Sequence, residues 1–367
     1  MPHYASTLKN AILKEVGSDE APEKALAGLR IVLNSGNGSG GFFNQVLEEL
    51  GADVSASIHV EPDGAFPAYI PNPESSQMVA ETTRVCDKAN ADIGIMLDTD
   101  ADRSGFVVPR TLYRDGTRSD YEALNRNRLI ALLAVIFSTS SPGCAIVTDS
   151  VTSEGLETFL QDDLGLQHVR YLRGYANVIN KARELTERGV ANAEVAIETS
   201  GHCAMKENGY LDDGTYTAVK VIGLLARVSR DDNDKSVMDL ISNLKEMPEE
   251  RELRMSVLDE TLQTTSAVFD FAALEIEQLC KSLGSDEDPA VATWSLDEDN
   301  LEGIRVRTGN GGFFMLRKSL HDPVISLQVE GTSRDEVRSC VIDPLLKLFD
   351  SEPQIRSALN LNALEAY

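Results

Sequence analysis

An apolar run that ends in alternating carboxylates constrains this chain more than any other feature. Residues 93–97 read Ile-Gly-Ile-Met-Leu, which predicts a buried strand, and Asp98, Asp100 and Asp102 follow at every second position. Side chains at i, i+2 and i+4 of an extended segment point to the same side. The sequence therefore predicts that three carboxylates converge at the end of a core strand.

Residues 98–103, the metal loop, have the composition of a magnesium site. Three hard oxygen ligands repel one another unless a cation binds, and Mg2+ keeps positions open for water and phosphate. We expect Asp98, Asp100 and Asp102 to hold the ion, and Arg103 to face a phosphate and not the metal. An acidic surface turn is the alternative, against which the apolar strand argues. A helix-loop-helix calcium loop is disfavoured, because Arg103 and Pro109 occupy its glycine and glutamate positions.

The order of the expected elements predicts an α/β fold with parallel or mostly parallel sheets, in which one βα unit is duplicated. Strands are expected at residues 29–34, 53–60, 92–97, 144–148, 168–171 and 193–198. Helices are expected at residues 42–50, 75–90, 127–137, 153–160 and 177–188.

The expected order of elements changes near residue 249, where several strands are expected between two helices. Strands are expected near residue 254 and at 303–307, 313–317 and 324–330, with helices at 272–283 and 333–349. This pattern favours a small α+β domain. We therefore predict three domains: 1–118, which begins with an N-terminal linker at 1–25, then 119–248, then 249–367.

A glycine-rich turn resembles a dinucleotide-binding fingerprint. Gly36 to Gly41 fits G-x-G-x-x-G between a strand and a helix, and Glu61 follows some 20 residues later. Glycine is also what a tight strand-to-helix turn needs, and no dehydrogenase residues accompany the motif. We regard the turn as structural, with nucleotide binding as the alternative.

A second polar loop, the sugar loop at residues 198–202, follows the apolar strand at 193–197. Its candidate ligands for vicinal sugar hydroxyls are Glu198, Ser200, Gly201 and His202. Open α/β sheets bind ligands at the carboxyl ends of their strands. The carboxylate, hydroxyl and imidazole supply hydrogen-bonding groups, and Gly201 would let a ligand approach the backbone. A polar loop with a helix cap at Ser200 is the alternative.

Cations gather in a third segment, the anion loop at residues 317–323. Arg317, Lys318, Ser319 and His321 follow an apolar strand, in a chain that is otherwise negative. Arg317 offers a two-pronged donor and Ser319 a hydroxyl, which together suit a dianionic phosphate. An exposed loop with incidental charges is the alternative.

Composition excludes several classes of function. A net charge of -25 over 367 residues disfavours a nucleic-acid partner, because phosphate backbones demand a broad basic surface. We expect no membrane span, since no apolar run is long enough, and no secretion signal. The five cysteines are scattered and odd in number, which favours reduced thiols and a cytoplasmic location, with an organelle as the alternative.

The three loops, in this order, resemble motifs of the α-D-phosphohexomutase superfamily, the phosphoglucomutases and phosphomannomutases. The metal loop resembles D-x-D-x-D-R, the sugar loop resembles E-x-S-G-H, and Arg317, Ser319 and His321 correspond to a loop that grips the substrate's distal phosphate. Pro71-Asn-Pro-Glu74 matches another family segment. The resemblance implies two related α/β phosphohexomutase-type domains followed by a smaller α+β C-terminal domain.

The resemblance also implies an activity in carbohydrate metabolism. Family members interconvert hexose 1-phosphate and hexose 6-phosphate by intramolecular phosphoryl transfer, through a bisphosphorylated sugar. In this chain Mg2+ at the aspartates and Arg103 would stabilise the transferred phosphoryl group, while Glu198 and Ser200 hold sugar hydroxyls. Relatives carry a basic residue at the position of Ala176, and Arg173 is expected to replace it.

One family part is not found in these residues. The family's phosphoryl donor is a phosphoserine in a loop resembling T-x-S-H-N-P in a first domain, and no Ser-His-Asn stretch occurs here. We therefore expect a truncated or split mutase, inactive alone, that needs a separate or missing N-terminal catalytic domain and binds metal poorly without it.

Two alternatives stay open. In phosphotransferases of the haloacid dehalogenase class the first Asp of D-x-D is the nucleophile, which Asp98 would be here, with Asp212 and Asp213 as further metal ligands. The other alternative is a sugar-phosphate-binding remnant without catalysis.

Overall fold

The computed structural model describes residues 2–17, 21–113, 115–231, 235–281, 289–297, 300–319 and 322–367. By their contacts these residues form two compact units. The first unit comprises Met1–Asp149 and Phe159–Leu244, and the second comprises Ser150–Thr158 and Lys245–Tyr367. The predicted domain boundaries at 118/119 and 248/249 stay predictions.

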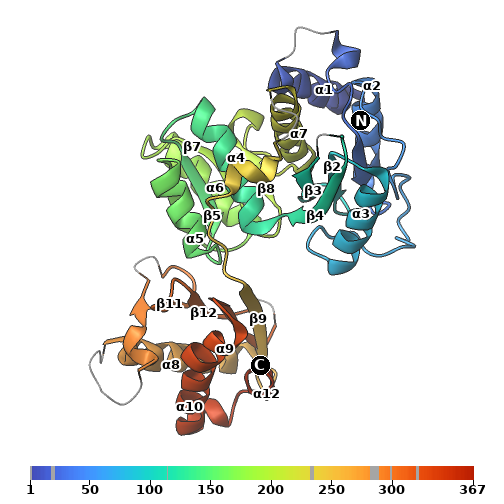
Figure 1. Ribbon diagram of the computed structural model, residues 1–367. Coiled ribbons are helices and arrows are strands. Elements are labelled where there is room, and N and C mark those ends of the chain that lie inside the picture. Colours follow the sequence, from blue (N-terminus) through green and yellow to red (C-terminus); the bar gives the residue numbers. More distant parts are fainter. Residues whose placement is uncertain are drawn as a thin grey trace. The chain divides into compact units, whose positions relative to one another are not determined.

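The first sheet of the first unit has the strand order β1-β2-β3-β4 (Figure 1). β1 (Ile31–Asn34) and β2 (Ile93–Leu97) are parallel and buried, as their apolar runs predict. β3 (Ser104–Leu112) and β4 (Arg118–Leu124) are antiparallel. A mostly parallel sheet was therefore the wrong expectation here, because the chain turns back directly after the metal loop instead of crossing over through a helix.

The strand expected at residues 53–60 was also a wrong prediction. This segment meets β1 through two isolated parallel bridges, Arg30 to Asp53 and Asn34 to Ile58. Between them the amide of Leu33 donates to Ser57 Oγ at 3.0 Å, so a side chain takes the place of a backbone acceptor. Serine side chains compete with ladder bonds in this way, and a periodic sequence does not reveal it.

The second sheet repeats the plan of the first. Its order is β6-β5-β7-β8, in which β5 (Ala145–Asp149), β6 (Gln167–Tyr171) and β7 (Ala193–Ile197) are parallel and β8 (Cys203–Met205) is antiparallel. In both sheets a parallel strand runs into a polar loop and returns antiparallel: β2 to β3 through the metal loop, β7 to β8 through the sugar loop. The duplicated α/β architecture is confirmed.

Helices cover these sheets largely where periodicity predicted them. The α-helices of the first unit are α1 (Pro2–Val16), α2 (Phe43–Glu49), α3 (Ser76–Ala89), α4 (Arg126–Ser140), α6 (Tyr175–Glu187) and α7 (Gly214–Asp231). Short 3-10 turns are η1 (Pro22–Lys24), η2 (Ser39–Phe42), η4 (Lys206–Asn208) and η5 (Val237–Ile241), and η3 (Phe159–Asp163) is a π-helical turn.

The N-terminal segment, expected to be a linker, forms helix α1. It buries Leu8, Ile12 and Val16, which share one face at i, i+4 and i+8, and it packs beside α7 (Figure 1). Lys220 of α7 is buried between Glu15 of α1 and Glu207, at 2.6 and 2.8 Å. A buried cation between two carboxylates ties α1 firmly to the first unit.

The second unit is built on an antiparallel sheet of order β10-β11-β12-β13-β9. Its strands are β9 (Glu249–Ser256), β10 (Ser295–Leu296), β11 (Ile304–Arg307), β12 (Phe313–Lys318) and β13 (Val324–Gly331). Its helical segments are α5 (Glu154–Thr158), α8 (Leu262–Lys281), η6 (Val291–Thr293), α9 (Arg334–Val337), η7 (Arg338–Ile342), α10 (Asp343–Ser351), α11 (Pro353–Arg356) and α12 (Asn362–Glu365). This arrangement confirms the α+β class.

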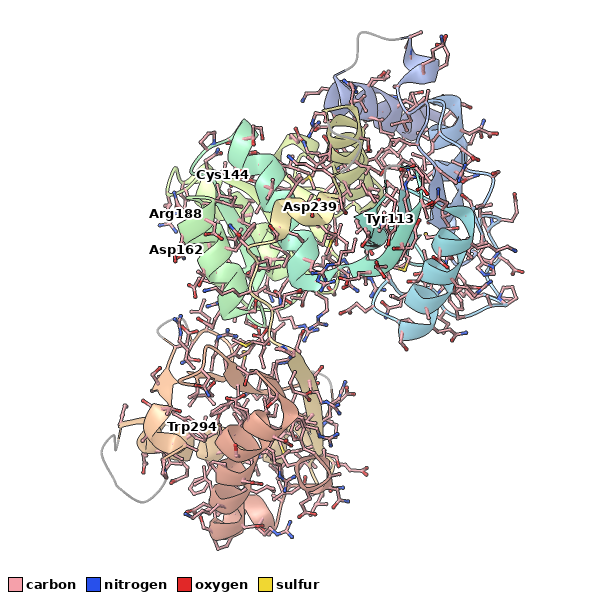
Figure 2. The ribbon with its side chains drawn as sticks, viewed as in Figure 1. Tyr113, Cys144, Asp162, Arg188, Asp239 and Trp294 are labelled. Atoms are coloured by element: carbon pink, nitrogen blue, oxygen red, sulfur yellow. The ribbon has the colours of Figure 1, made fainter. Side chains whose placement is uncertain are left out.

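The core of the second unit centres on Trp294, the tryptophan labelled in Figure 2. Its side chain is 1% exposed and packs edge-on against Phe314, with ring centroids 4.6 Å apart. Arg305 is buried as well and pairs with Asp297 and Glu154 at 2.9 and 2.7 Å, which joins α5 to this unit. Among the helices of the described ranges, none is both long and apolar enough to cross a membrane.

Candidate functional site

The metal loop lies where β2 ends, and its three carboxylates converge. One oxygen from each of Asp98, Asp100 and Asp102 lies within 4.8 Å of the others. The reason differs from the one that the sequence suggested. The loop is not extended but bent, with Ala101 in the left-handed region at φ 66°. The carboxylates meet because the backbone curls around them, and not because of strand alternation.

Arg103 closes this bend on Asp98. The Asp98 side chain is 1% exposed, and its two oxygens accept from the backbone N–H of Arg103 at 3.1 Å and from Arg103 Nε at 2.8 Å. One edge of the Arg103 guanidinium thus contacts Asp98, and the expectation that Arg103 faces a phosphate stays a prediction. The two Nη atoms donate no hydrogen bond to a described residue.

The same geometry argues against Asp98 as a nucleophile. An aspartyl nucleophile needs an oxygen that can reach a phosphorus atom. Asp98 is buried, and both of its oxygens are held by Arg103. The arrangement suits a metal ligand oriented by its arginine better than the nucleophile of the dehalogenase class.

Three glycines enclose the metal loop by backbone contact. A Cβ on Gly38 would lie 2.7 Å from the carbonyl oxygen of Asp98, and one on Gly214 would lie 2.7 Å from that of Arg103. A Cβ on Gly201 would lie 2.6 Å from the carbonyl oxygen of Ser104, and Gly201 has φ +98°. The glycine-rich turn thus packs on the metal loop, which accounts for it without a nucleotide. Gly201 likewise makes room for the backbone of Ser104, and its role in letting a ligand approach stays a prediction.

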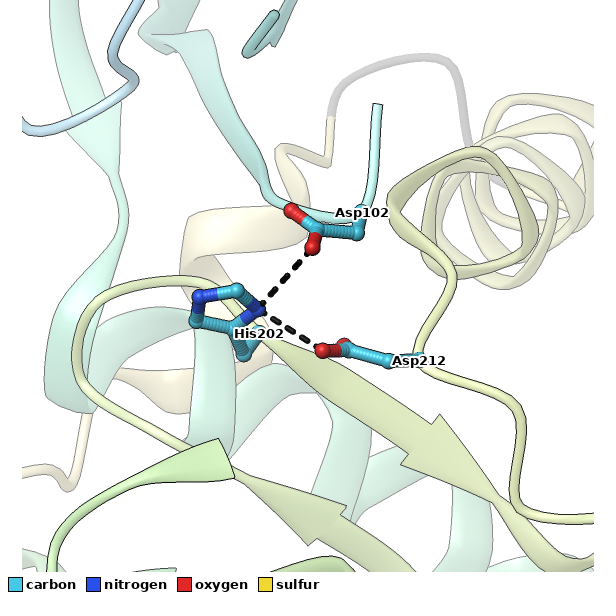
Figure 3. Close-up of side chains that lie close together, drawn as sticks. All are labelled: Asp102, His202 and Asp212. Atoms are coloured by element: carbon cyan, nitrogen blue, oxygen red, sulfur yellow. Dashed lines mark hydrogen bonds and ion pairs between the residues drawn. The ribbon is translucent and has the colours of Figure 1, made fainter. Parts of the chain in front are cut away.

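His202 brings the sugar loop against the metal loop (Figure 3). Its Nδ1 lies 2.8 Å from Asp212 Oδ2 and 3.7 Å from Asp102 Oδ2. The backbones of Arg103 and His202 also form an antiparallel bridge. The two loops, predicted separately as metal and sugar sites, therefore make one continuous polar surface within the first unit.

The pKa values of Asp102 and His202 are shifted by burial and by the charged groups around them. Burial raises the pKa of Asp102 to about 7, helped by the charges of Asp98 and Asp212. Asp102 Oδ1 has no hydrogen-bond partner among the described residues. Burial alone would lower the pKa of His202, but its hydrogen bond to Asp212 and the charges of Asp212 and Asp102 raise it. A proton or a cation is therefore favoured between these carboxylates.

The remainder of the sugar loop is held by its own hydrogen bonds. Glu198 Oε1 accepts from the backbone N–H of Gly174 at 2.6 Å, and Ser200 Oγ lies 3.4 Å from Glu198 Oε2. Burial raises the pKa of Glu198, and the charge of Arg173 opposes that shift. Behind the loop, Asp149 accepts from Thr199 Oγ1 at 2.8 Å. The structure thus brings Glu198, Ser200, His202 and Arg173 together.

The anion loop belongs to the second unit. Arg317 Nη2 pairs with Glu252 Oε1 at 2.9 Å, and Ser319 Oγ accepts from the backbone N–H of Asp322 at 3.2 Å. Lys318 Nζ lies 3.2 Å from Ser266 Oγ and over the ring of Phe269. His321 lies outside the described residues. Arg317 lies at the end of strand β12 and Ser319 follows that strand, and their binding of a phosphate stays a prediction.

Sequence reasoning missed two neighbours of His202. The sequence indicates Asp212 only as a metal ligand of the alternative enzyme class, and it indicates no role for Tyr175. Tyr175 begins α6 and stacks on the His202 ring, with centroids 4.9 Å apart and planes at 27°. The Asp-Asp-Gly run before α7 does indicate a helix cap, which Asp213 supplies to the amide of Tyr216 at 2.9 Å. No local signal points to the contact of Asp212 with His202.

Comparison with known families gives two matches, which lie mostly in the first unit. Residues 2–111 match the family model described as phosphoglucomutase/phosphomannomutase, alpha/beta/alpha domain II. Residues 125–247 match alpha/beta/alpha domain III of the same family. The matched ranges contain the metal loop and the sugar loop.

Individual proteins resemble the chain over most of its length. A phosphomannomutase/phosphoglucomutase of Pseudomonas aeruginosa is 26% identical over 342 residues, which is 92% of this chain and 64% of that protein. A phosphoglucomutase/phosphomannomutase family protein of Burkholderia thailandensis has a similar fold, with TM-score 0.70, 23% identity and coverage of 94% of this chain and 65% of that one. An Aspergillus fumigatus N-acetylphosphoglucosamine mutase, solved with GlcNAc-6P and magnesium, gives TM-score 0.58 at 14% identity, over 94% and 68% of the two chains. The chain spans less than two thirds of the length of its Pseudomonas relative.

Proposed function

Because this chain belongs to the α-D-phosphohexomutase superfamily, we propose that it forms the metal-, sugar- and phosphate-binding part of an enzyme that interconverts hexose 1-phosphate and hexose 6-phosphate. The observation that carries the proposal is the meeting of the metal loop and the sugar loop through Asp102 and His202. A phosphoryl group bound at the first loop then lies beside hydroxyl-binding groups of the second.

The aspartates fit Mg2+. Their oxygens lie within 4.8 Å of one another, and Asp102 keeps an oxygen that no described residue bonds. Burial raises the pKa of Asp102, and repulsion from Asp98 adds to the shift; a divalent cation would offset both effects. When bound, the ion would neutralise charge on the transferred phosphoryl group.

The residues around the aspartates would orient the reacting groups. Arg103, held through Nε by Asp98, presents its Nη edge to a phosphoryl oxygen. Glu198 and Ser200 accept and donate hydrogen bonds to neighbouring sugar hydroxyls, and Arg173 contributes a positive charge beside them. In the second unit, Arg317 and Ser319 would bind the phosphate that does not react.

The phosphoryl donor would come from another domain. The chain spans 64% of its Pseudomonas aeruginosa relative, and we propose that a phosphoserine-bearing domain, on the same polypeptide or on another, supplies the phosphoryl group. Turnover then requires both parts, and these residues alone bind sugar phosphate without converting it.

A binding experiment tests the metal and sugar parts together. Glucose 1,6-bisphosphate, whose phosphate oxygens can complete the weak metal site of the chain alone, is titrated calorimetrically into the full chain with and without saturating Mg2+. We expect Mg2+ to raise the affinity about tenfold or more, and Asp102→Asn to remove that gain, because the ion bridges carboxylates and phosphate. Asp162→Asn, the same change at an exposed aspartate labelled in Figure 2, serves as the control. An affinity that is independent of Mg2+, or a variant that behaves like the control, would refute the proposal.

A second experiment tests turnover. The chain is mixed with a separately expressed phosphoserine domain of a relative, and conversion of glucose 1-phosphate to glucose 6-phosphate is followed. Conversion that depends on both components supports a mutase. Sugar phosphate binding without conversion would instead favour the remnant that lost catalysis.

A further inference from the structure

We propose that Asp212 is a positioning residue that holds the neutral ring of His202 as the Nδ1–H tautomer, so that Nε2 is presented as a hydrogen-bond acceptor to a hydroxyl of the bound hexose phosphate. The proposal rests on the proposed function, since the hexose phosphate site is itself proposed. It assigns a role to a residue outside the three loops.

The two oxygens of Asp212 are engaged by the sugar loop and by strand β8, which follows it. Oδ1 accepts from the backbone N–H of Cys203 at 3.0 Å, and Oδ2 lies 2.8 Å from His202 Nδ1. The Asp212 backbone also pairs with Ala204 of β8 in an antiparallel bridge. The carboxylate is therefore fixed in position from both its main chain and its side chain.

For the neutral ring, these contacts leave one arrangement of protons. A backbone N–H can only donate, and an ionised carboxylate can only accept, so His202 Nδ1 must carry a hydrogen to bond Oδ2. A neutral imidazole has one N–H, and which nitrogen carries it is decided by the partner of that nitrogen. Nε2 is then a lone-pair acceptor.

The ring is also held in its plane. Tyr175 stacks on one face, with centroids 4.9 Å apart, and Figure 3 shows Nδ1 turned to Asp212 and Asp102 with the other nitrogen on the far side of the ring. Nε2 makes no hydrogen bond to any residue that the structure describes. Glu198 and Ser200 of the same loop are the proposed ligands of the sugar hydroxyls. His202 Nε2 would be a third ligand of these hydroxyls.

The substitution Asp212→Asn inverts this arrangement without changing size. An amide has one accepting oxygen and one donating NH2 group. The N–H of Cys203 still demands the oxygen, so the NH2 group faces His202 Nδ1. Nδ1 must then accept, and the hydrogen moves to Nε2.

Nitrogen NMR reads the tautomer directly. The full chain is labelled with 15N-histidine, spectra are recorded at a pH where the rings are neutral, and His202→Gln identifies the signals of His202 among five histidines. We expect Nδ1 protonated and Nε2 unprotonated in the wild type, and the reverse in Asp212→Asn, with Asp162→Asn unchanged. An Nε2–H ring in the wild type, or no exchange in the variant, would overturn the assignment.

Fluorinated sugar phosphates test whether His202 Nε2 accepts a hydrogen bond from the bound sugar. 3-Deoxy-3-fluoro- and 4-deoxy-4-fluoroglucose 6-phosphate cannot donate from the altered position, so the wild type should bind one of them about tenfold more weakly than glucose 6-phosphate, as loss of one hydrogen bond implies. Asp212→Asn should lose that discrimination, and adding it to His202→Gln should change nothing further. Equal discrimination in wild type and Asp212→Asn contradicts the role of Nε2. If no form binds glucose 6-phosphate, the proposed function fails, and the tautomer assignment is then decided by the spectra alone.

Discussion

The metal loop and the anion loop both follow a buried strand and both carry charged ligands, yet they are held by different forces. The metal loop is enclosed by the backbones of Gly38, Gly201 and Gly214, at distances that leave no room for a methyl group. In the anion loop, Arg317 lies at the end of strand β12 and pairs with the partly exposed Glu252. Close packing fixes a loop rigidly, whereas a partly exposed ion pair contributes little. The comparison teaches that the metal loop is held rigidly by backbone packing, while the segment that carries Arg317 depends on weaker side-chain contacts.

Among the substitutions that test this contrast, Gly201→Ala is expected to have the largest effect. The new Cβ would lie 2.6 Å from the carbonyl oxygen of Ser104, at a backbone φ of +98°. We expect the free energy of unfolding to fall by about 3 kcal/mol, from overpacking and backbone strain together. Urea unfolding, with hydrogen exchange of residues 93–108 to localise the loss, is the measurement.

Gly28→Ala is the matched control for that substitution. Gly28 has φ +88°, and a Cβ there meets no atom within 4 Å. Its cost should be that of the left-handed conformation alone, about 1 kcal/mol. Equal losses in the two variants would show that the metal loop is not tightly enclosed.

In the anion loop, Arg317→Ala should change binding more than stability. Loss of the guanidinium should weaken binding of inorganic phosphate or glucose 6-phosphate about tenfold or more. The free energy of unfolding should change by less than about 1 kcal/mol, because the pair with Glu252 is partly exposed. Calorimetric titration and urea unfolding measure the two effects.

Arg356→Ala is the control for this pair, because Arg356 is an exposed cation of α11 that lies 3.1 Å from Asp350, outside the anion loop. It should leave sugar phosphate affinity nearly unchanged. A loss as large as that of Arg317→Ala would mean that overall charge, and not the fork of Arg317, attracts the phosphate.

A smaller effect at the metal loop is expected in the pH dependence of the free energy of unfolding. The pKa of Asp102 is about 7 in the folded, metal-free chain and about 4 when unfolded, so the folded chain binds the extra proton between these values. Stability due to this group is present below pH 4 and is lost as the pH rises through 7. His202 has the same sign, because its raised pKa makes its contribution fade as the pH rises through that pKa.

We expect the loss to be on the order of 1 kcal/mol, since Asp102 is partly exposed and screened. Urea unfolding of metal-free protein from pH 4 to 8 measures it, and saturating Mg2+ should reduce the slope because it favours the ionised carboxylate. Asp102→Asn should flatten the difference curve. Parallel curves for wild type and variant would contradict the shift.

The smallest effect is expected from Glu252→Gln. Removing this negative charge beside Arg317 should strengthen phosphate binding about twofold to threefold and change unfolding free energy by about 0.5 kcal/mol or less. Glu277→Gln, on the exposed face of α8, controls for net charge. Weaker binding in Glu252→Gln would show that the carboxylate positions Arg317 and does not compete with phosphate.

The sequence predicted most core elements, because apolar periodicity is local information. Strands β2, β5 and β7 and helix α3 lie within a few residues of where periodicity placed them. The prediction from periodicity was wrong at residues 53–60, where the Ser57 side chain replaces a backbone acceptor. It was also wrong at α1, which was expected to be a linker and whose packing against α7 is not visible in the sequence.

The candidate site was predictable as separate motifs but not as an assembly. Asp98, Asp100 and Asp102 were expected to converge by strand alternation, whereas Ala101 bends the loop and Arg103 closes it. The contact of Asp212 with His202 joins residues on either side of β8, and no periodic pattern encodes it. Sequence motifs indicate which chemical groups a site contains, whereas tertiary contacts determine which of those groups lie close together.

Enclosure of the metal loop implies an order of events during synthesis of the chain. The loop leaves the ribosome soon after β2, but the backbone of Gly201 and Gly214 that closes over it is made much later. Contacts between such distant segments form late, because a long loop must close before they are gained. A nascent chain that ends before α7 therefore has its acidic residues without the walls that hold them together, and it should gain ion affinity only when both halves of the first unit have emerged.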